Sequence, residues 1–259
     1  MTIAWAPARD ALDRARDAGR TVRAWLRDDD CVAVTPALER LAAACAGVGL
    51  PVLLAVIPEP AEPALAPWIA AHAAVTPCQH GFAHTNHAAE GERARELGGT
   101  RSPDDVLDDL ARGRAKLRAL FGARLADVLV PPWNRIDAGL LPRLPALGFT
   151  ALSTFGPTPA GGPIPRLDSD IDVVDWRHGR VGRPLADIAG RLADVVARQD
   201  TVGLLTHHLA HDAAAWAAVG ETLERLGAHP AVRFVDAASL LASMVPGQGG
   251  RRAGSEPAA

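Results

Sequence analysis

The chain has 259 residues, of which 48% are hydrophobic and 22% charged, and its formal net charge is -3. These values are typical of a globular protein with a large core, and the length fits one α/β barrel as well as two smaller domains. No strongly basic balance and no apolar run of membrane-spanning length is found, so neither nucleic acid nor a membrane is expected as a partner.

Cysteine use and the N-terminal sequence bear on the compartment. Cys31, Cys45 and Cys78 are odd in number and form no close pair, which favours a reducing environment. The first twenty residues lack the uninterrupted apolar core of a signal peptide. We therefore expect a cytoplasmic protein, and the sequence carries no signal of its oligomeric state.

Short apolar runs recur along the chain, with segments of helical periodicity between them. Most runs are almost continuously apolar, as expected for parallel strands that are covered on both faces. The predicted strands are residues 22–28, 51–57, 73–79, 127–132, 149–154, 171–176, 201–207 and 232–236.

The intervening helices have recognisable ends. Thr35 and Pro36 begin one helix, which Gly49 ends. Ser102 begins a second with a capping-box sequence, and Gly122 ends it. Two more helices are predicted over residues 185–198 and 213–226, the latter ended by Gly227.

Repeated strand–helix units with short connections imply right-handed crossovers and a parallel sheet. Seven or eight such units in one chain favour a barrel over an open sheet. We predict a single α/β barrel domain over residues 1–245, with a Pro/Gly-rich loop at 156–169 and a disordered tail over 246–259.

Polar residues directly follow five of the predicted strands, and we call these segments the strand-end clusters. Each has an ordinary structural explanation when taken alone, such as a solvated turn or a helix cap. The active sites of α/β barrels, however, lie at the carboxyl ends of the strands, and carboxylates with imidazoles are ligands that zinc selects. The clusters are RDDDC (27–31), HGFAH (80–84), PPWNR (131–135), DWRH (175–178) and THHLAH (206–211).

In this order the clusters resemble the five motifs of the polysaccharide deacetylase family, also called the chitooligosaccharide deacetylase or carbohydrate esterase family 4 group. RDDDC resembles the family's Thr-Phe-Asp-Asp-Gly, and HGFAH has the spacing of His-Ser/Thr-x-x-His. VPPWN, DVVDW and LLTHH resemble the third, fourth and fifth motifs. The resemblance covers about residues 22 to 240 and implies a distorted (β/α)7–8 barrel.

The resemblance also implies a divalent metal ion, with zinc expected and cobalt, nickel or manganese as alternatives. Asp30, His80 and His84 match the metal ligands, and Asp29 matches the catalytic base. A register shift of one residue stays open, in which Asp28 is the base and Asp29 the ligand.

His207 matches the family's catalytic acid, and Asp175 matches the aspartate that orients and charges that histidine. Candidate substrate contacts lie around the same rim. They are Pro132, Trp133, Asn134, Arg135, Trp176 and His87.

Two positions depart from the family pattern. Val130 stands where the third motif has the arginine that holds the catalytic aspartate, and Arg135 or Arg27 is a candidate replacement. Gly81 stands where the second motif has a hydroxyl residue. The chain has no tyrosine and only 4% aromatic residues, so a long groove for stacking sugars is not expected, and Trp133 and Trp176 are the stacking candidates.

The resemblance implies removal of an acyl group from an N-acylated sugar or a related amide by metal-activated water. The expected partner is therefore a small-molecule or oligosaccharide substrate. Two alternatives stay open: hydrolysis of a non-sugar amide C–N bond, and a barrel without turnover that only binds a carbohydrate-like ligand. Val130 favours the last alternative, and the complete Asp, His, His and His207 set argues against it.

Overall fold

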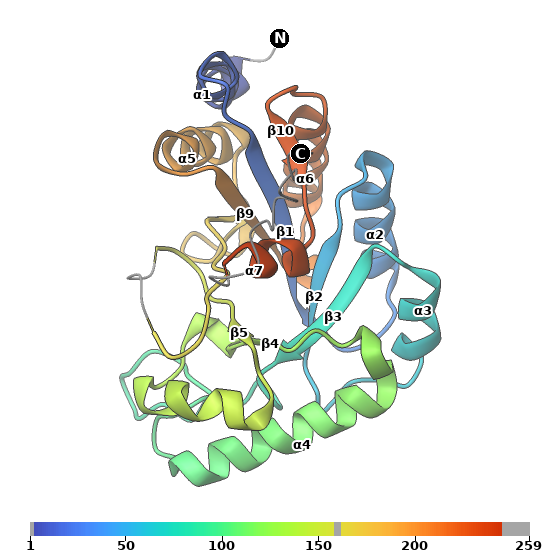
Figure 1. Cartoon of the computed structure of the whole chain (residues 1–259), viewed down its shortest axis with the longest axis vertical. Helices are drawn as coiled ribbons and strands as arrows, with labels where there is room; N and C mark the ends of the chain where they lie inside the picture. Colours follow the sequence, from blue (N-terminus) through green and yellow to red (C-terminus); the bar gives the residue numbers. More distant parts are fainter. Residues whose placement is uncertain (1–2, 158–161, 245–259) are drawn as a thin grey trace, which may run out of the picture.

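The computed structural model describes residues 3–157 and 162–244, and its centre is a parallel sheet (Figure 1). The strands in chain order are β1 (Val22–Cys31), β2 (Val52–Val56), β3 (Val75–His80), β4 (Val128–Val130), β5 (Ala151–Leu152), β6 (Ile171–Asp172), β7 (Val174–Asp175), β8 (Val181–Gly182), β9 (Thr201–Thr206) and β10 (Val232–Phe234). The order across the sheet is β5-β4-β3-β2-β1-β9-β6, and β10 pairs with the beginning of β1. Strands β7 and β8 form a separate antiparallel hairpin.

The segment that leads into β6 closes this sheet into a distorted barrel. Its first part pairs with β5, because the Leu152 N–H donates to the Pro165 carbonyl and the Leu167 N–H donates to the Leu152 carbonyl, both at 2.9 Å. Its second part pairs with β9, where the Asp170 N–H donates to the Gly203 carbonyl at 2.8 Å. The predicted barrel is therefore confirmed, although isolated bridges hold this part of it.

Helices surround the barrel in the order α1 (Ala6–Asp17), α2 (Pro36–Val48), α3 (Leu65–Ala71), α4 (Pro103–Phe121), α5 (Leu185–Arg198), α6 (Ala213–Gly227) and α7 (Ala237–Met244). Short 3-10 turns are η1 (Ile3–Trp5), η2 (Gly122–Arg124), η3 (Pro132–Asn134), η4 (Ala138–Leu147) and η5 (His208–Ala210). Helices α2, α4, α5 and α6 confirm the four predicted helices, whereas the sequence analysis does not predict α1, α3 and α7. The predicted caps form: Thr35 Oγ1 accepts the Leu38 N–H, and Ser102 Oγ accepts the Asp105 N–H.

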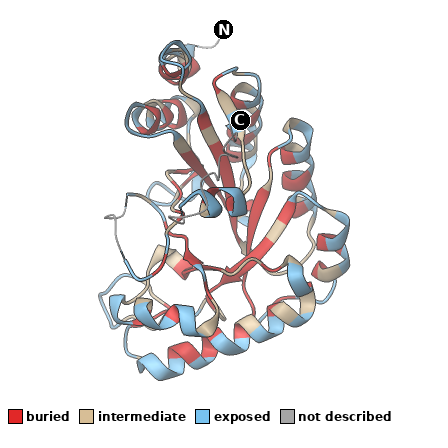
Figure 2. Ribbon diagram, in the orientation of Figure 1, coloured by how far each residue is buried: buried red, intermediate tan, exposed pale blue. Residues whose placement is uncertain are grey.

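Alternation along β1 separates two cores. Trp25 packs inside the barrel with Leu53 and Cys78, whereas Leu26 packs in the layer between the sheet and the outer helices. Leu240 of α7 joins the interior cluster, and α7 lies over the middle of the ring of strands in Figure 1. Figure 2 shows the buried strands enclosed by helices whose outer faces are exposed. Since α7 follows β10, which pairs with the start of β1, it closes the amino-terminal end of the barrel and leaves the carboxyl end for a site.

The predicted strands differ from the structure in their bounds, most of all where 149–154 contains only Ala151–Leu152 and where the segments 171–176 and 127–132 end early. The prediction of one strand over 171–176 is wrong, because the chain leaves the barrel after Asp172 and Val174–Asp175 turns away to pair with β8. The predicted strand 127–132 ends at Val130, since Pro131 and Pro132 have no N–H to donate to a neighbouring strand.

Part of the prediction lies outside the described residues. This applies to residue 245 at the end of the predicted domain, to the predicted tail at 246–259, and to residues 158–161 of the Pro/Gly-rich loop. Within the part of the chain that the structure describes, no helix is both long enough and apolar enough to cross a membrane.

A buried ion pair joins β1 to η5. Asp28 is 0% exposed and His208 is 1% exposed. The Asp28 carboxylate accepts hydrogen bonds from His208 Nδ1, from the His208 backbone N–H at 3.0 Å and from Thr206 Oγ1 at 2.7 Å. Because every contact lies on the outer face of the sheet, this pair fastens β1 to the turn that carries the last strand-end cluster.

We expect Asp28→Asn to lower the free energy of unfolding by roughly 3–5 kcal/mol, because His208 stays buried without its charged partner. Urea denaturation of the wild type and the variant measures the difference. The double variant Asp28→Asn, His208→Gln serves as the control, and it should lose less than the sum of the two single variants. Additive losses would show that the two side chains are not coupled.

The contribution of this pair should also depend on pH. Burial is the largest influence on the pKa of Asp28 and raises it, but the charge of His208 and the hydrogen bonds from His208 and Thr206 together outweigh burial, and the pKa lies below its ordinary value of 3.8. Burial is the largest influence on the pKa of His208 and lowers it, but the charge of Asp28 and its hydrogen bond with His208 together outweigh burial, and the pKa lies above 6.5. The contribution of Asp28 to stability is complete above pH 3.8 and is lost as the pH falls through its lowered pKa. The contribution of His208 is complete below pH 6.5 and is lost as the pH rises through its raised pKa. The difference between wild type and Asp28→Asn should therefore be greatest between these two values.

Candidate metal centre and active site

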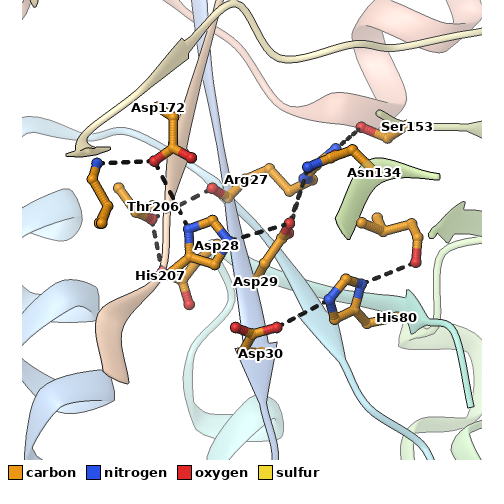
Figure 3. Close-up of polar contacts among 12 residues, drawn as sticks. Arg27, Asp28, Asp29, Asp30, His80, Asn134, Ser153, Asp172, Thr206 and His207 are labelled. Atoms are coloured by element: carbon orange, nitrogen blue, oxygen red, sulfur yellow. Dashed lines mark hydrogen bonds and ion pairs between the residues drawn. The ribbon is translucent and has the colours of Figure 1, made fainter. Parts of the chain in front are cut away.

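A cavity of about 710 Å³ lies at the carboxyl ends of the barrel strands. Residues from all five strand-end clusters line it, so the sequence clusters do converge. Figure 3 shows its inner part, where side chains from β1, β3 and the segments after β4, β6 and β9 face one another. The site therefore has the position that the barrel architecture predicts.

Asp30, His80 and His84 form a set of three possible metal ligands, with donor atoms within 4.8 Å of one another. His80 Nε2 lies 3.1 Å and His84 Nε2 lies 3.3 Å from Asp30 Oδ1. His80 Nδ1 lies 2.9 Å from the Val130 carbonyl oxygen, to which it can donate, and this leaves the Nε2 lone pair for a metal. Two imidazoles and one carboxylate are a donor set that suits zinc and related divalent ions.

The pKa shifts of Asp30 and His84 fit a bound cation, whereas the hydrogen bond with Asp30 and the charges of Asp29 and Asp30 outweigh burial and raise the pKa of His80. Burial raises the pKa of Asp30, but its hydrogen bond with His80 and the neighbouring charges outweigh burial and hold the pKa below its ordinary value. Burial and the neighbouring His80 lower the pKa of His84, which favours a neutral imidazole. An ionised carboxylate and a neutral imidazole are the forms that bind a metal ion.

An irregularity in β1 places both Asp29 and Asp30 in the cavity. The pairing of β1 with β2 shifts between Asp28 and Cys31, so β1 has one residue more than its partner here. Asp30 has φ of 69°, in the left-handed region. Regular alternation would turn Asp30 to the outer face with Asp28. The bulge instead brings Asp30 to the side of Asp29.

The open register question is resolved by this geometry. Asp28 does not line the cavity, and its carboxylate is occupied by His208 and Thr206 on the outer face of the sheet. The alternative in which Asp28 is the base and Asp29 the ligand is therefore not compatible with the structure.

Glu96 holds the loop that carries His84, a role that the sequence analysis does not detect. Its buried carboxylate accepts the N–H groups of Phe82 at 3.0 Å, Ala83 at 2.7 Å and Thr85 at 3.3 Å. His84 itself has φ of 56°, so the loop follows a backbone path that non-glycine residues rarely adopt. Glu96 lies in a polar segment without periodicity, and no local signal links it to His84.

The same loop explains the glycine in the second motif. Gly81 has φ of 53°, and a Cβ atom there would lie 1.9 Å from Glu96 Oε2 and 2.5 Å from Pro132 Cγ. The hydroxyl residue that the resemblance implies does not fit at this position, because the Glu96 carboxylate occupies its place.

Arg27 holds Asp29 from inside the barrel. Its guanidinium is 0% exposed and donates from Nε to Asp29 Oδ1 at 2.8 Å and from Nη2 to Asp29 Oδ2 at 2.9 Å. It also donates to Ser153 Oγ and Asn134 Oδ1, both at 2.7 Å (Figure 3). Arg27 thus makes the contact with Asp29 that the resemblance assigns to an arginine at position 130, where this chain has Val130. The other candidate, Arg135, donates to the Ala94 carbonyl instead.

His207 lies between two carboxylates. Its Nε2 is 3.9 Å from Asp29 Oδ2, and its Nδ1 is 3.9 Å from Asp172 Oδ1. Asp172 is fixed by hydrogen bonds from the Val174 N–H at 2.9 Å and from Trp176 Nε1 at 2.7 Å. The Trp176 ring meets the His207 ring edge-on, with centroids 4.8 Å apart.

The prediction that Asp175 lies within reach of His207 is wrong. The Asp175 carboxylate is 2.9 Å from His178 Nδ1 and 3.6 Å from Arg183 Nη1, in the β7–β8 hairpin. The motif DVVDW contains two aspartates, and the barrel strand ends at the first. Asp172 therefore has the position that the sequence analysis gives to Asp175.

Four of the six predicted substrate contacts line the cavity: Trp133, Asn134, Arg135 and Trp176. Trp133 packs on the His84 ring, with centroids 4.3 Å apart. Pro132 and His87 are not among the residues that line the cavity, and their role as substrate contacts stays a prediction. Pro132 is buried beside Gly81, and the His87 backbone is bonded to Arg95 and Thr100.

The fold and the site together define a parallel α/β barrel in which an Asp-His-His group that could hold a metal ion lies at the carboxyl ends of the strands. Solved structures of deacetylases and esterases share this fold at low sequence identity. A T48 deacetylase with substrate matches at TM-score 0.58 and 17% identity, over 86% of this chain and 92% of that chain. The Bc1960 peptidoglycan N-acetylglucosamine deacetylase matches at 0.58 and 16%, over 84% and 86%. A family 4 acetyl xylan esterase from Clostridium thermocellum, in complex with a cobalt ion, matches at 0.55 and 15%, over 85% and 91%.

No family model matches the sequence, and a comparison with curated proteins finds no relative. The resemblance to the polysaccharide deacetylase family is therefore confirmed in the fold, which many deacetylases and carbohydrate esterases of known structure share.

We expect His80→Ala to weaken metal binding by more than about 100-fold, because changes even to groups behind a ligand cost about 10–100-fold. Metal content after dialysis against a fixed zinc concentration measures this, with circular dichroism as the check that the barrel is folded. His87→Ala is the matched control, since it removes a histidine from the same segment but outside the cavity. Equal metal content in both variants and the wild type would exclude His80 as a ligand.

Proposed function

We propose that this protein is a metal-dependent hydrolase that removes an acyl group from an N-acylated sugar or a related amide. The observation that carries the proposal is the convergence of three metal-binding side chains, a carboxylate and an imidazole in one cavity, with His207 Nε2 3.9 Å from Asp29 Oδ2. The shared fold with deacetylases that act on N-acetylated sugars supports the same reaction class by analogy.

Asp30, His80 and His84 are the residues that would hold the metal, with zinc as the proposed ion and cobalt, nickel or manganese as alternatives. When bound, a divalent ion at this position supplies Lewis acidity, which acidifies a water molecule and polarises the acyl carbonyl group.

Asp29 is the proposed general base, which accepts the proton of the attacking water. The two hydrogen bonds from Arg27 fix the plane of its carboxylate, so that no side-chain freedom has to be lost during the reaction. Asn134 and Ser153 accept hydrogen bonds from Arg27, so the segments after β4 and after β5 also hold its guanidinium in place.

His207 is the proposed general acid, which donates a proton to the leaving nitrogen as the C–N bond breaks. The Asp172 carboxylate lies on the Nδ1 side of the ring, 3.9 Å from that nitrogen, and is the proposed positioning partner of the imidazole. The Trp176 ring packs against the imidazole and limits its rotation.

The turn after β4 is the proposed source of a backbone N–H for the developing oxyanion. The N–H groups of Asn134 and Arg135 donate to the carbonyls of Pro131 and Pro132. Trp133 has φ of 53° and lines the cavity, so its N–H is the candidate donor.

Two alternatives make different predictions for the same protein. A hydrolase of non-sugar amides would need the same residues and the same metal, and would differ only in substrate. A non-catalytic barrel is favoured by the absence of the third-motif arginine. The buried Arg27 argues against this alternative, because it holds the Asp29 carboxylate in place of that arginine.

We expect Asp29→Asn to reduce kcat on an N-acetylated amino sugar by roughly 10²–10⁴-fold, because the amide keeps the shape of the side chain but cannot accept a proton. Steady-state kinetics with metal content measured on the same sample test this. Loss of the metal together with activity would make Asp29 a ligand. Full activity in the variant would contradict the proposed mechanism.

The role of His207 should depend on the leaving group. An amine must be protonated as it leaves, whereas a nitrophenolate leaves unaided, so His207→Ala should lower amide hydrolysis at least about 10-fold more than hydrolysis of nitrophenyl acetate. Asp172→Asn should produce the same pattern more weakly, and Asp175→Asn is the control that should not change the ratio of the two activities. A larger effect from Asp175→Asn than from Asp172→Asn would restore the pairing expected from the sequence.

A further inference from the structure

The cavity carries more positive charge at its rim than the proposed reaction uses. Five arginines line it: Arg135, Arg177, Arg180, Arg183 and Arg191. Two are engaged with the protein, Arg135 with the Ala94 carbonyl and Arg183 with the carbonyls of Asp172 and Val174 and the Asp175 carboxylate. Arg177 and Arg180 are bonded to Asp175 only through their backbone N–H groups. Among the residues that the structure describes, none accepts a hydrogen bond from the guanidinium groups of Arg177, Arg180 and Arg191 or forms an ion pair with them.

The acidic groups of the cavity are too few to balance its arginines, since five arginines and four aspartates line it and Asp29 is already paired with Arg27 from outside the lining. Asp29 is held by Arg27, and Asp30 lies against His80 and His84. Asp172 accepts hydrogen bonds from Trp176 and the Val174 N–H, and Asp175 pairs with His178. In a chain of net charge -3, the rim is therefore a local region of unbalanced positive charge.

Two separate elements bring the unpaired guanidinium groups to this cavity. Arg177 and Arg180 lie in the turn between β7 and β8, and Arg191 lies on α5. The Arg180 guanidinium lies over the Trp176 ring, 5.3 Å from its centroid, and its backbone has φ of 58°. Because Trp176 also bonds to Asp172 and packs on His207, this turn is connected directly to the proposed catalytic acid.

The remaining lining indicates a small ligand with an apolar face. Trp133, Phe155 and Trp176 present aromatic rings to the same cavity. Its volume of about 710 Å³ lies in the range of pockets that enclose small molecules. Arginine presents two parallel N–H groups that match the oxygen pairs of a carboxylate or a phosphate.

We infer that the substrate is a small N-acyl compound with a carboxylate or phosphate group, which Arg177, Arg180 and Arg191 bind at the rim while the acyl group lies at Asp29 and His207. This inference rests on the proposed function, because it places the acyl group at the proposed catalytic residues. It deepens the proposal by assigning a charge to the substrate, which a neutral polysaccharide does not have.

The test compares three related compounds: neutral N-acetylglucosamine, its 6-phosphate, and N-acetylmuramic acid, which carries a carboxylate. We expect kcat/KM to be at least roughly 10-fold higher for one of the two anions than for the neutral sugar, since a hydrogen bond to a charged group contributes about that factor. The preferred anion distinguishes phosphate from carboxylate. Equal or lower values for both anions would overturn the inference while leaving a deacetylase in place.

Binding measured by calorimetry separates the two proposals if no compound is hydrolysed. In that case the missing hydrolysis contradicts the proposed function for these compounds, and tighter binding of an anion than of the neutral sugar would still support the rim site. Equal binding of all three compounds would overturn the rim site as well.

Arginine variants test whether the preference for anionic compounds comes from the rim of the cavity. Arg180→Gln and Arg191→Gln should each lower the ratio of anionic to neutral kcat/KM, or of binding constants, by roughly 10-fold. Arg198→Gln is the matched control, because it removes the same charge from α5 at a position that does not line the cavity, and it should leave the ratio unchanged. An equal fall in Arg198→Gln would show a general field effect, and an unchanged ratio in the two rim variants would also overturn the inference.

Discussion

The bulge in β1 is the feature on which the rest of the site depends. Three consecutive aspartates on a regular strand would point alternately to the two faces of the sheet. The extra residue between Asp28 and Cys31, with left-handed backbone at Asp30, gives the three carboxylates different environments instead. Asp28 stabilises the outer layer with His208, Asp29 enters the barrel, and Asp30 joins the two histidines of the second cluster.

Arg27 is the second constraint, because a buried guanidinium is costly unless all its donors are satisfied. Here it bonds to the Asp29 carboxylate, Asn134, Ser153 and the Thr154 carbonyl. These partners come from β1, the turn after β4 and the region after β5. One buried charge therefore connects strands from both sides of the barrel interior and fixes the group that we propose as the base.

Backbone strain is concentrated at the same place. In the part of the chain that the structure describes, the non-glycine residues with left-handed φ are Asp30, His84, Trp133, Asn134 and Arg180, and all of them line the cavity. Such conformations persist where surrounding contacts enforce them, and they are concentrated at functional sites. Glu96 supplies such contacts on both sides of His84, and Arg27 supplies one to Asn134; neither Glu96 nor Arg27 is a proposed metal ligand or proton carrier.

The sequence by itself determined the architecture and the composition of the site. Apolar runs between capped helices predicted the barrel, and the ordered clusters predicted Asp29, Asp30, His80, His84 and His207, which the structure brings to one cavity. It could not decide which aspartate of DVVDW faces His207, or whether Arg27 or Arg135 holds Asp29. These choices depend on where a strand leaves the sheet and where it bulges, which are set by contacts between segments far apart in the sequence. Local propensity predicts that a strand exists, but only tertiary packing decides its last residue and the direction of each side chain. Here β6 ends at Asp172, and this end point decides between Asp172 and Asp175, three residues further on.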